Sequence, residues 1–310
     1  MEILWRKGLG DDMKKHKPYK KKFYSAIKTN PSRFEWSQLP FLAIVMPIVL
    51  FMLMPLVYIF NHAFKPFDEL IEYPPRFFVR RPTLDNFEEL FRTATTTGIP
   101  VSRYLFNSIV ITLIVVLLSI FLATITGFAL SKLKFHIKGV IMQINTLAMM
   151  FVGTAVVIPR YIIVERLGLI DNFMVHILPM IAIPVGLFLV KQFIDQIPNE
   201  LIEAAKIDGA SSFMIYWKIV LPLIKPAIAT IAILTFQGVW NNADISATYI
   251  NTDALKTFAY YMSTLASSSN VVAGQGMNAV ATLIMFIPNL VIFIFLQNKV
   301  MNTMVHSGIK

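Results

Sequence analysis

Residues 198–222 read PNELIEAAKIDGASSFMIYWKIVLP and form a polar, patterned connection between two long apolar runs. The initial Pro-Asn pair can start a helix, whose first turn then holds acidic side chains that oppose the helix dipole. Gly209 is placed to end that helix in a left-handed conformation. A second short helix is expected over 211–219. The Leu221-Pro222 step that ends the stretch, and the Lys225-Pro226 step four residues later, are expected to stop this second helix.

Six apolar runs surround this connection, and each can cross a bilayer as a helix. About 20 apolar residues span the hydrocarbon core, and a lone strand would leave its backbone unpaired in lipid. The runs cover 36–64, 104–131, 139–159, 172–190, 226–243 and about 277–296. The sequence therefore predicts an all-α membrane protein with six transmembrane helices.

The composition agrees with a membrane protein. The chain of 310 residues is 56% hydrophobic and 15% charged, with a mean hydropathy of +0.63. Soluble domains average about 45–50% apolar and about 25% charged residues, so these values exclude an ordinary cytosolic enzyme, and they also exclude a disordered chain. The absence of cysteine excludes disulfides, thiolate metal sites and a cysteine nucleophile.

The net charge of +10 is concentrated ahead of the first apolar run. Ten of the 28 Lys and Arg residues lie within 1–38, and basic flanks orient membrane helices toward the cytoplasm. Both termini are therefore expected in the cytoplasm, with a basic arm at 1–38, a transmembrane domain at 39–298 and a tail at 299–310. The arm is expected to contact anionic membrane lipid and no nucleic acid.

The sequence contains no constellation that points to catalysis or metal binding. No G-x-x-x-x-G-K-[ST] stretch is present to cradle nucleotide phosphates, and the five His residues are scattered. We therefore expect no enzyme activity, no catalytic residue, no metal site and no cofactor bound by this chain. The apolar runs contain no Asp, Glu, Lys or Arg, and their histidines are His62, near the end of the first run, and His176. This composition disfavours an ion-coupled secondary transporter.

The polar connection resembles the EAA loop of binding-protein-dependent ABC importer permeases. The matching strings are EAAxxDGA at 203–210 and IxLPxxxP at 219–226, in a connection between the fourth and fifth apolar runs. The layout from about residue 39 to the tail is similar to the sugar-importer branch, in particular to the smaller maltose-type permease subunit. The resemblance implies a type I ABC importer permease fold. The alternative is an amphipathic helix that only anchors in lipid headgroups.

The resemblance implies that residues 198–222 are a coupling segment that docks on a partner ATPase. It implies a polar contact from Glu203, a close-packed face made by two alanines, and a bend formed at Gly209. The coupling residues so implied are Glu203, Ala204, Ala205, Asp208, Gly209, Ala210, Leu221 and Pro222. ATP and Mg would bind to the partner ATPase.

The same resemblance implies a multi-subunit importer. The expected partners are a second permease subunit, which forms a heterodimer with this chain, two ATPase subunits and an extracytoplasmic sugar-binding protein. The predicted function is a permease subunit that moves carbohydrate, in particular oligosaccharide, into the cytoplasm by alternating access. The expected location is the bacterial cytoplasmic membrane, whether inner or sole, with multiple spans. An importer for a non-sugar solute is the main alternative, and an ion-coupled secondary transporter is a further one.

Polar and aromatic side chains within the apolar runs are candidates for a sugar path. They are Asn145, Gln237, Trp240, Asn241 and Asn242, and hydrogen bonding between helices is their alternative use. The outer connection 244–276 is long and polar, and in maltose-type permeases the corresponding loop reaches into the cleft of the binding protein. The candidates for that contact are Asn270, Gly274, Gln275 and Gly276. A solvated flexible loop is the alternative.

Overall fold

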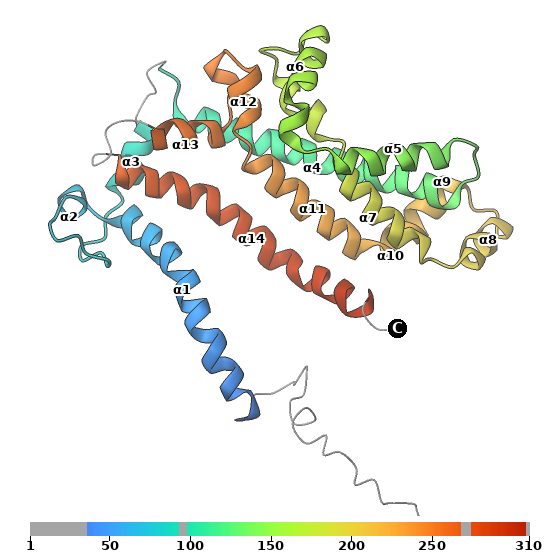
Figure 1. The fold of residues 1–310 in the computed structure, drawn as a ribbon, viewed down its shortest axis with the longest axis horizontal. Helices are drawn as coiled ribbons and strands as arrows, with labels where there is room; N and C mark the ends of the chain where they lie inside the picture. The colour runs from blue at the N-terminus through green and yellow to red at the C-terminus, as the bar shows by residue number, and fades with distance from the viewer. Residues whose placement is uncertain (1–35, 93–97, 268–273, 308–310) are drawn as a thin grey trace, which may run out of the picture. The chain divides into compact units, whose positions relative to one another are not determined.

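The computed structural model describes residues 36–92, 98–267 and 274–307 of the chain. The regular structure of these residues is helical, with no strand among them (Figure 1). The chain forms two units, 1–57 and 58–310. The described part of the first unit is a 3₁₀ turn, Trp36–Gln38, and most of helix α1, Leu39–Phe64.

The second unit holds the end of α1 and all later elements. In chain order these are α2 (Phe67–Leu70), α3 (Asp85–Arg92), α4 (Val101–Lys132), α5 (Lys138–Met150), η2 (Gly153–Val156), α6 (Val157–Arg166), η3 (Phe173–His176), η4 (Leu178–Met180), α7 (Pro184–Asp195), α8 (Asn199–Ile207), α9 (Ser212–Ile215), the π-helical turn η5 (Tyr216–Val220), α10 (Leu221–Leu223), α11 (Lys225–Trp240), α12 (Asp244–Tyr249), η6 (Asp253–Leu255), α13 (Phe258–Ser267) and α14 (Gln275–Ser307).

Three helices, α1, α4 and α14, are long and apolar enough to cross a membrane unbroken. Three further pairs have the length and apolarity of a span only when taken together. The break between α5 and η2–α6 bends by 109°, that between η3–η4 and α7 by 40°, and that between α9–α10 and α11 by 79°. The described residues therefore hold three spans, or up to six if each bent pair counts as one. The predicted runs 139–159 and 172–190 are thus not single straight helices, whereas residues 226–240 of the run 226–243 form one helix, α11, that follows the third bend.

Prolines explain where two of the three bent pairs break. Pro184 begins α7, and Pro226 lies in the first turn of α11. The first pair breaks at 151–152, between α5 and η2, and Pro159 lies further on, in the first turn of α6. A proline lacks the N–H that would bond to the carbonyl four residues back, and its ring clashes with that carbonyl. A helix therefore restarts just ahead of each proline. An apolar run can thus have the length of a span without forming one helix.

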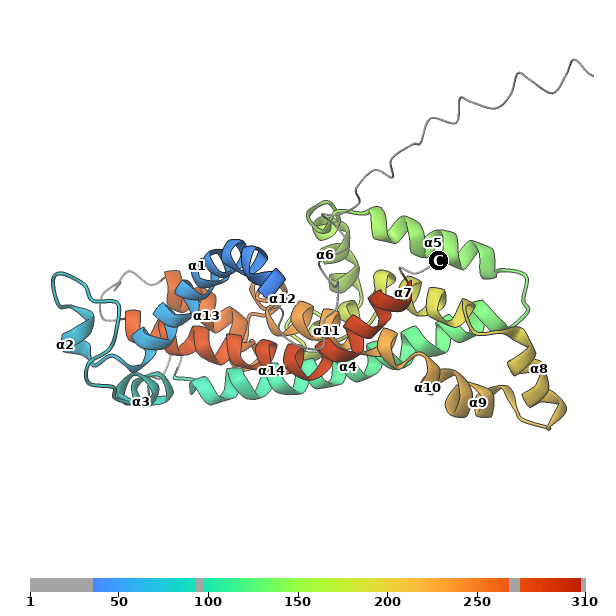
Figure 2. The ribbon, with the colours of Figure 1, turned by 90° about the horizontal axis from the view of Figure 1, so that it is seen from below.

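Helix α4 connects the two main apolar clusters of the second unit (Figure 2). Near its start, buried side chains from the end of α1, α3, α13 and α14 pack with it. Near its end it packs with α7, α11 and the coupling segment. Gly127 allows α7 to approach closely, because a Cβ at this position would lie 2.7 Å from Val190 Cγ1.

Candidate coupling and translocation site

The first helix of the coupling segment, α8, ends in the left-handed turn that the sequence predicts. Gly209 has φ +83°. The Ala210 N–H donates to the Ala205 carbonyl (2.9 Å), and the Gly209 N–H donates to the Lys206 carbonyl (3.0 Å). These two bonds form the Schellman motif that caps a helix with a left-handed residue. The helix and its glycine bend are therefore confirmed.

The second half of the coupling segment differs from the prediction at Pro222. Ser211 caps α9 by accepting the Met214 N–H (3.2 Å). The helix then continues through the π-helical turn η5 into α10, which contains Pro222. The chain changes direction by 79° at Ile224, directly ahead of the predicted Lys225-Pro226 step. A π turn widens the backbone and makes room for the ring of Pro222 against the carbonyl four residues back.

The coupling segment is anchored on one face and exposed on the other. Its buried side chains are Ile202, Ile215, Tyr216 and Val220, which join the apolar cluster shared by α4, α7 and α11. Ile207, near the tip, is 86% exposed. Of the predicted coupling residues, Glu203, Ala204, Asp208, Gly209 and Pro222 are exposed, and Ala205, Ala210 and Leu221 pack against the protein's own core. Buried side chains therefore hold the coupling segment to the rest of the protein, while its tip is exposed. We call the segment a knob for this reason.

Three of the predicted path residues lie at the end of α11. Trp240 is buried, and its Nε1 donates to the Met285 carbonyl of α14 (3.0 Å). Asn241 is exposed, and its Oδ1 accepts a hydrogen bond from Asn289 Nδ2 of α14 (3.2 Å). Gln237 is exposed on the same helix. Two of these side chains therefore join α11 to α14, which is a use that the sequence left open.

Asn145 lies beside the break that precedes α7. Its Nδ2 donates to the Pro184 carbonyl (3.0 Å), and Ser119 Oγ of α4 donates to the Ile181 carbonyl (3.0 Å). Irregular backbone within a membrane needs such partners or a cavity beside it. Asn145 also lines a cavity of about 240 Å³ between α4, α5 and the start of α7. Polar groups and space therefore occur together at this break.

The outer connection predicted at 244–276 is largely helical. It contains α12, η6 and α13, and α14 already begins at Gln275. Asn242 Oδ1 accepts the Ile245 N–H (3.0 Å) and so caps the start of α12. Asn270 lies outside the described residues. The described part of this connection is therefore folded and is not a flexible loop.

Gly276 lies buried in the first turn of α14, beside Asn86 of α3. A Cβ on Gly276 would lie 2.1 Å from Asn86 Oδ1. The Asn86 side chain is fixed because its Nδ2 donates to the carbonyls of Ala63 (3.0 Å) and Lys65 (2.7 Å). Gly276 therefore packs against the protein itself, and the two residues ahead of it line a cavity of about 350 Å³.

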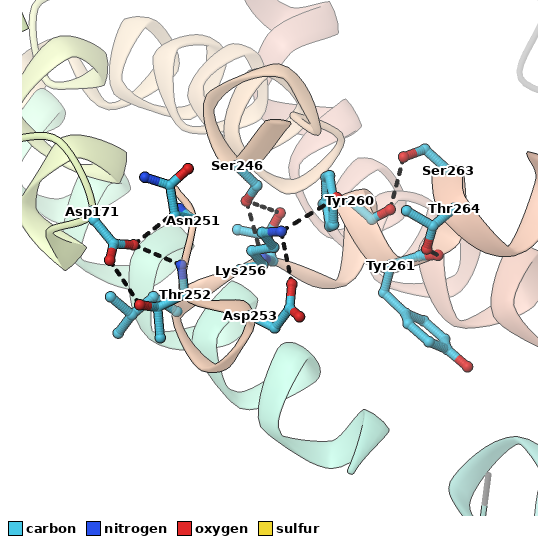
Figure 3. A network of polar contacts seen from close by, with 12 residues as sticks. Asp171, Ser246, Asn251, Thr252, Asp253, Lys256, Tyr260, Tyr261, Ser263 and Thr264 are labelled. Carbon is cyan, nitrogen blue, oxygen red and sulfur yellow. Dashed lines mark hydrogen bonds and ion pairs between the residues drawn. The ribbon is translucent and has the colours of Figure 1, made fainter. Parts of the chain in front are cut away.

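Residues 249–258, which we call the outer segment, are held by a network of polar contacts (Figure 3). Asp171 Oδ1 accepts the N–H groups of Asn251 (2.9 Å) and Thr252 (2.7 Å). Its Oδ2 accepts the hydroxyl of Thr252 (2.7 Å). One carboxylate therefore ties the turn ahead of η3 to a segment 80 residues further along the chain.

Further contacts fix the outer segment to its neighbours. His176 is buried, and its Nε2 lies 3.2 Å from the Leu255 carbonyl. The Thr257 N–H donates to Ser246 Oγ (3.1 Å). His176 thus has a structural partner. Among the residues that the structure describes, no group of three or more His, Cys, Asp or Glu side chains could hold a metal ion.

Asp171 is held in its charged form. Hydrogen bonds from the N–H and the hydroxyl of Thr252, together with the Asn251 N–H, lower the pKa of Asp171 below its ordinary value. Because the folded pKa is the lower one, the stabilisation is complete above the pKa of an unfolded Asp, about 3.9. It is lost as the pH falls through the folded value.

Asp171→Asn is expected to raise the hydrogen-exchange rates of the Asn251 and Thr252 amides several-fold at pH 7. Both carboxylate oxygens of Asp171 accept hydrogen bonds, and the NH₂ group that replaces one of them cannot accept any. In the native chain, protection of these amides should fall below pH about 4, and in the variant it should depend less on pH. Exchange measured by mass spectrometry checks this result. Asp253→Asn is the control, because Asp253 bonds Lys256. Equal protection in the Asp171→Asn variant and the native chain would show that Asp171 does not hold the outer segment.

The sequence does not show the bonding partners of two polar residues of this region, Asp171 and Asn86. Asp171 belongs to an Asp-Asn pair, and its φ of +57° suits the left-handed tolerance of such turn residues. Asn86 lies in α3, in the connection between α1 and α4. A turn composition marks the first, but nothing local shows which backbone groups either side chain bonds.

The apolar helices and the exposed coupling segment define a helical membrane protein with a surface that is open to a partner. Residues 116–300 match the model of the family described as binding-protein-dependent transport system inner membrane component, and the chain belongs to this family. The prediction from the sequence of an ABC importer permease of the sugar branch is confirmed. An ion-coupled secondary transporter is not supported.

Similar proteins cover most of the chain. Protein LplC of Bacillus subtilis (strain 168) is 30% identical over 270 residues, which are 83% of this chain and 89% of LplC. The galactooligosaccharides transport system permease protein GanQ of the same organism is 30% identical over 281 residues, 89% of this chain and 95% of GanQ. A chain of a bacterial ABC transporter involved in the import of the acidic polysaccharide alginate matches the fold with a TM-score of 0.72 at 20% identity, covering 87% of this chain and 99% of that chain.

Proposed function

We propose that this chain is one of two permease subunits of an ATP-driven importer that brings carbohydrate, in particular oligosaccharide, across the bacterial cytoplasmic membrane. The observation that carries the proposal is the coupling segment, a knob fixed by buried side chains and open at its tip. The substrate class is supported by relatives such as GanQ, which is named for galactooligosaccharides.

The tip of the coupling segment is the surface that docks on the partner ATPase. Glu203 and Ala204 lie exposed on α8, so a charged group and a small residue face outward side by side. Ala205 and Ala210 pack against the core, and their small side chains determine how far the tip projects from it. ATP and Mg bind to the ATPase, and this chain contributes the surface that follows its movement.

Six spans with both termini in the cytoplasm fit the chain best. The pair α5 with η2–α6 and the pair η3–η4 with α7 then each cross the membrane once, and α11 crosses without α9–α10, which belong to the coupling segment. The basic arm at 1–38 lies on the cytoplasmic side. The coupling segment lies on that same side, and the outer segment faces the extracytoplasmic binding protein. Gly274 and Gln275 are partly exposed near that face and are available for contact with it.

A second permease subunit covers apolar surface that this chain leaves open. No residue of α5 is buried. Its large exposed apolar side chains are Val140, Ile144, Leu147, Met149 and Met150. Gln237 and Asn241 are exposed on α11, and Asn145 faces the cavity beside α7. Amide side chains of this kind bond sugar hydroxyls, so the substrate path runs along these residues, with Trp240 and Asn242 supporting its outer end.

Purification of the complex tests the proposed function. The tagged chain, extracted from its source membrane in mild detergent, is expected to bring down a second permease and an ATPase. Hydrolysis of ATP by this complex should rise when the binding protein is loaded with oligosaccharide and should not rise with the empty protein. A chain that purifies without any ATPase would overturn the proposal. Stimulation by a loaded amino-acid-binding protein instead would replace the carbohydrate assignment.

A further inference from the structure

Helix α4 is one unbroken helix of 32 residues, about 48 Å long at 1.5 Å per residue. Side chains near its two ends bond two different segments, the coupling segment and the outer segment. We propose that α4 is the strut that carries displacement of the coupling segment to the outer segment, and that Thr124, Lys132 and Asn107 are positioning residues that fasten its ends. The proposal rests on the proposed function, in which the coupling segment follows the ATPase.

The inner end of α4 bonds both helices of the coupling segment. Thr124 Oγ1 and the Tyr216 hydroxyl lie 2.9 Å apart, and these residues are 1% and 2% exposed. Lys132 Nζ donates to the Ile197 carbonyl (2.6 Å) and to Asn199 Oδ1 (2.9 Å), at the link between α7 and α8. A displacement of either helix therefore pulls on α4 through a direct hydrogen bond.

Helix α7 reinforces the inner end. Gly127 brings the backbone of α4 within contact distance of Val190. Ser131 Oγ donates to Asp195 Oδ1 (2.5 Å), and Asp195 also pairs with Lys191 Nζ (2.6 Å). Thr124, Gly127 and Ser131 recur along α4 at the three- and four-residue spacing of one helix face, and Lys132 directly follows Ser131. The inner attachment therefore covers more than two turns of α4.

The outer end of α4 bonds the outer segment in the same manner. Asn107, which is 1% exposed, donates through Nδ2 to the carbonyls of Ala254 (2.8 Å) and Lys256 (2.9 Å). The Phe258 N–H donates to Ser108 Oγ (2.8 Å). The outer segment is thus attached to α4 by its main chain, so its path cannot shift without α4.

The alternative connection between these segments is less stiff. Helix α11 joins the two segments covalently, but a 79° bend at Ile224 separates it from the coupling segment. A break in a helix absorbs displacement, because the dihedral angles of one residue can change there. Helix α4 carries no proline and no break between its attachments. The stiff connection therefore runs through α4.

Distances between spin labels test the strut on the full chain in lipid nanodiscs. The chain has no cysteine, so each label position is unique. One pair, Lys206→Cys with Ser102→Cys, spans the coupling segment and the outer end of α4. The other pair, Ser102→Cys with Asn251→Cys, spans α4 and the outer segment. In the otherwise unchanged chain each pair is expected to give one narrow distance distribution.

Variants should release one end at a time. Thr124→Val with Lys132→Met is expected to broaden the 206–102 distribution and leave the 102–251 distribution unchanged. Asn107→Leu is expected to do the reverse. Thr124→Ser with Lys132→Arg retains the hydroxyl and the charged donor and should restore the narrow distribution. Variants that broaden both pairs would indicate a general loss of stability, and variants that change neither would show that these bonds fasten nothing; both results overturn the proposal.

Transport coupling is the second readout. In the purified importer, either release is expected to lower oligosaccharide uptake per ATP hydrolysed several-fold while hydrolysis continues. Unchanged uptake per ATP would also overturn the strut. Failure of the proposed function is recognised separately, because it appears as the absence of a co-purified ATPase. The distance measurements need no ATPase and report on the mechanical link alone.

Discussion

Gly209→Val is expected to separate the chain from its ATPase, whereas Gly209→Asn keeps the two together. Gly209 has φ +83° and completes the Schellman motif at the end of α8. A β-branched residue in the left-handed region costs about 1–3 kcal/mol, while asparagine visits that region routinely. The valine variant relieves this strain by opening the turn, which displaces the exposed tip on which docking depends.

The effect arises from the backbone and not from crowding. No atom lies within 4 Å of a Cβ built on Gly209, so both side chains have space. A strain of about 1–3 kcal/mol corresponds to roughly 5- to 150-fold weaker docking. Affinity purification from detergent, with the co-purified ATPase quantified, measures it. Equal recovery with both variants would contradict docking through the bend. Loss with both would indicate that the contact needs the bare glycine surface.

Gly276→Ala is expected to destabilise the chain by about 2–5 kcal/mol, from overpacking of about 1–3 kcal/mol and the loss of one or two hydrogen bonds of about 1 kcal/mol each. The new Cβ would lie 2.1 Å from Asn86 Oδ1 and 2.5 Å from its Cγ. The whole amide of Asn86 must therefore move. It then releases the carbonyls of Ala63 and Lys65, which join the end of α1 to α3.

Gly238→Ala is the matched control for this prediction. Gly238 lies within α11, and a Cβ added to it would have no atom within 4 Å. Alanine in a helix is favoured over glycine by about 0.5–1 kcal/mol. Thermal unfolding in detergent should give a lower midpoint temperature for Gly276→Ala than for the native chain, and an unchanged or higher one for Gly238→Ala. In an Asn86→Ala background the cost of Gly276→Ala should shrink. The same cost in both backgrounds would contradict the clash with Asn86.

Features governed by local sequence could be predicted well. The start of α8, its acidic first turn and the glycine bend follow from interactions among residues four or five apart. The apolar runs likewise depend on composition over about 20 residues, and the multi-pass helical class follows from them. The EAA string was sufficient to identify the family, because its positions lie within one connection.

Features governed by packing between distant segments could not be predicted in this way. Each proline can either interrupt a helix or be accommodated within it, and α10 continues through Pro222 because a π turn precedes it. The outer connection has a loop-like composition, yet Asp171 and Asn107 fold part of it by bonding to its main chain from far away. Trp240 and Asn241 are polar within an apolar run, and the proximity of α14 gives both a partner within the chain.

Short-range sequence patterns therefore determine which helices form, because helix formation, capping and the length of an apolar run involve residues that are neighbours along the chain. The partner of each buried polar group depends on which distant backbone reaches it, and that is settled when α4, α7, α11 and α14 pack together. Buried donors and acceptors must be paired, but the sequence alone is compatible with many different sets of partners. The three-dimensional arrangement selects one of them, and with it the bends, the anchoring of the knob and the attachment of the outer segment.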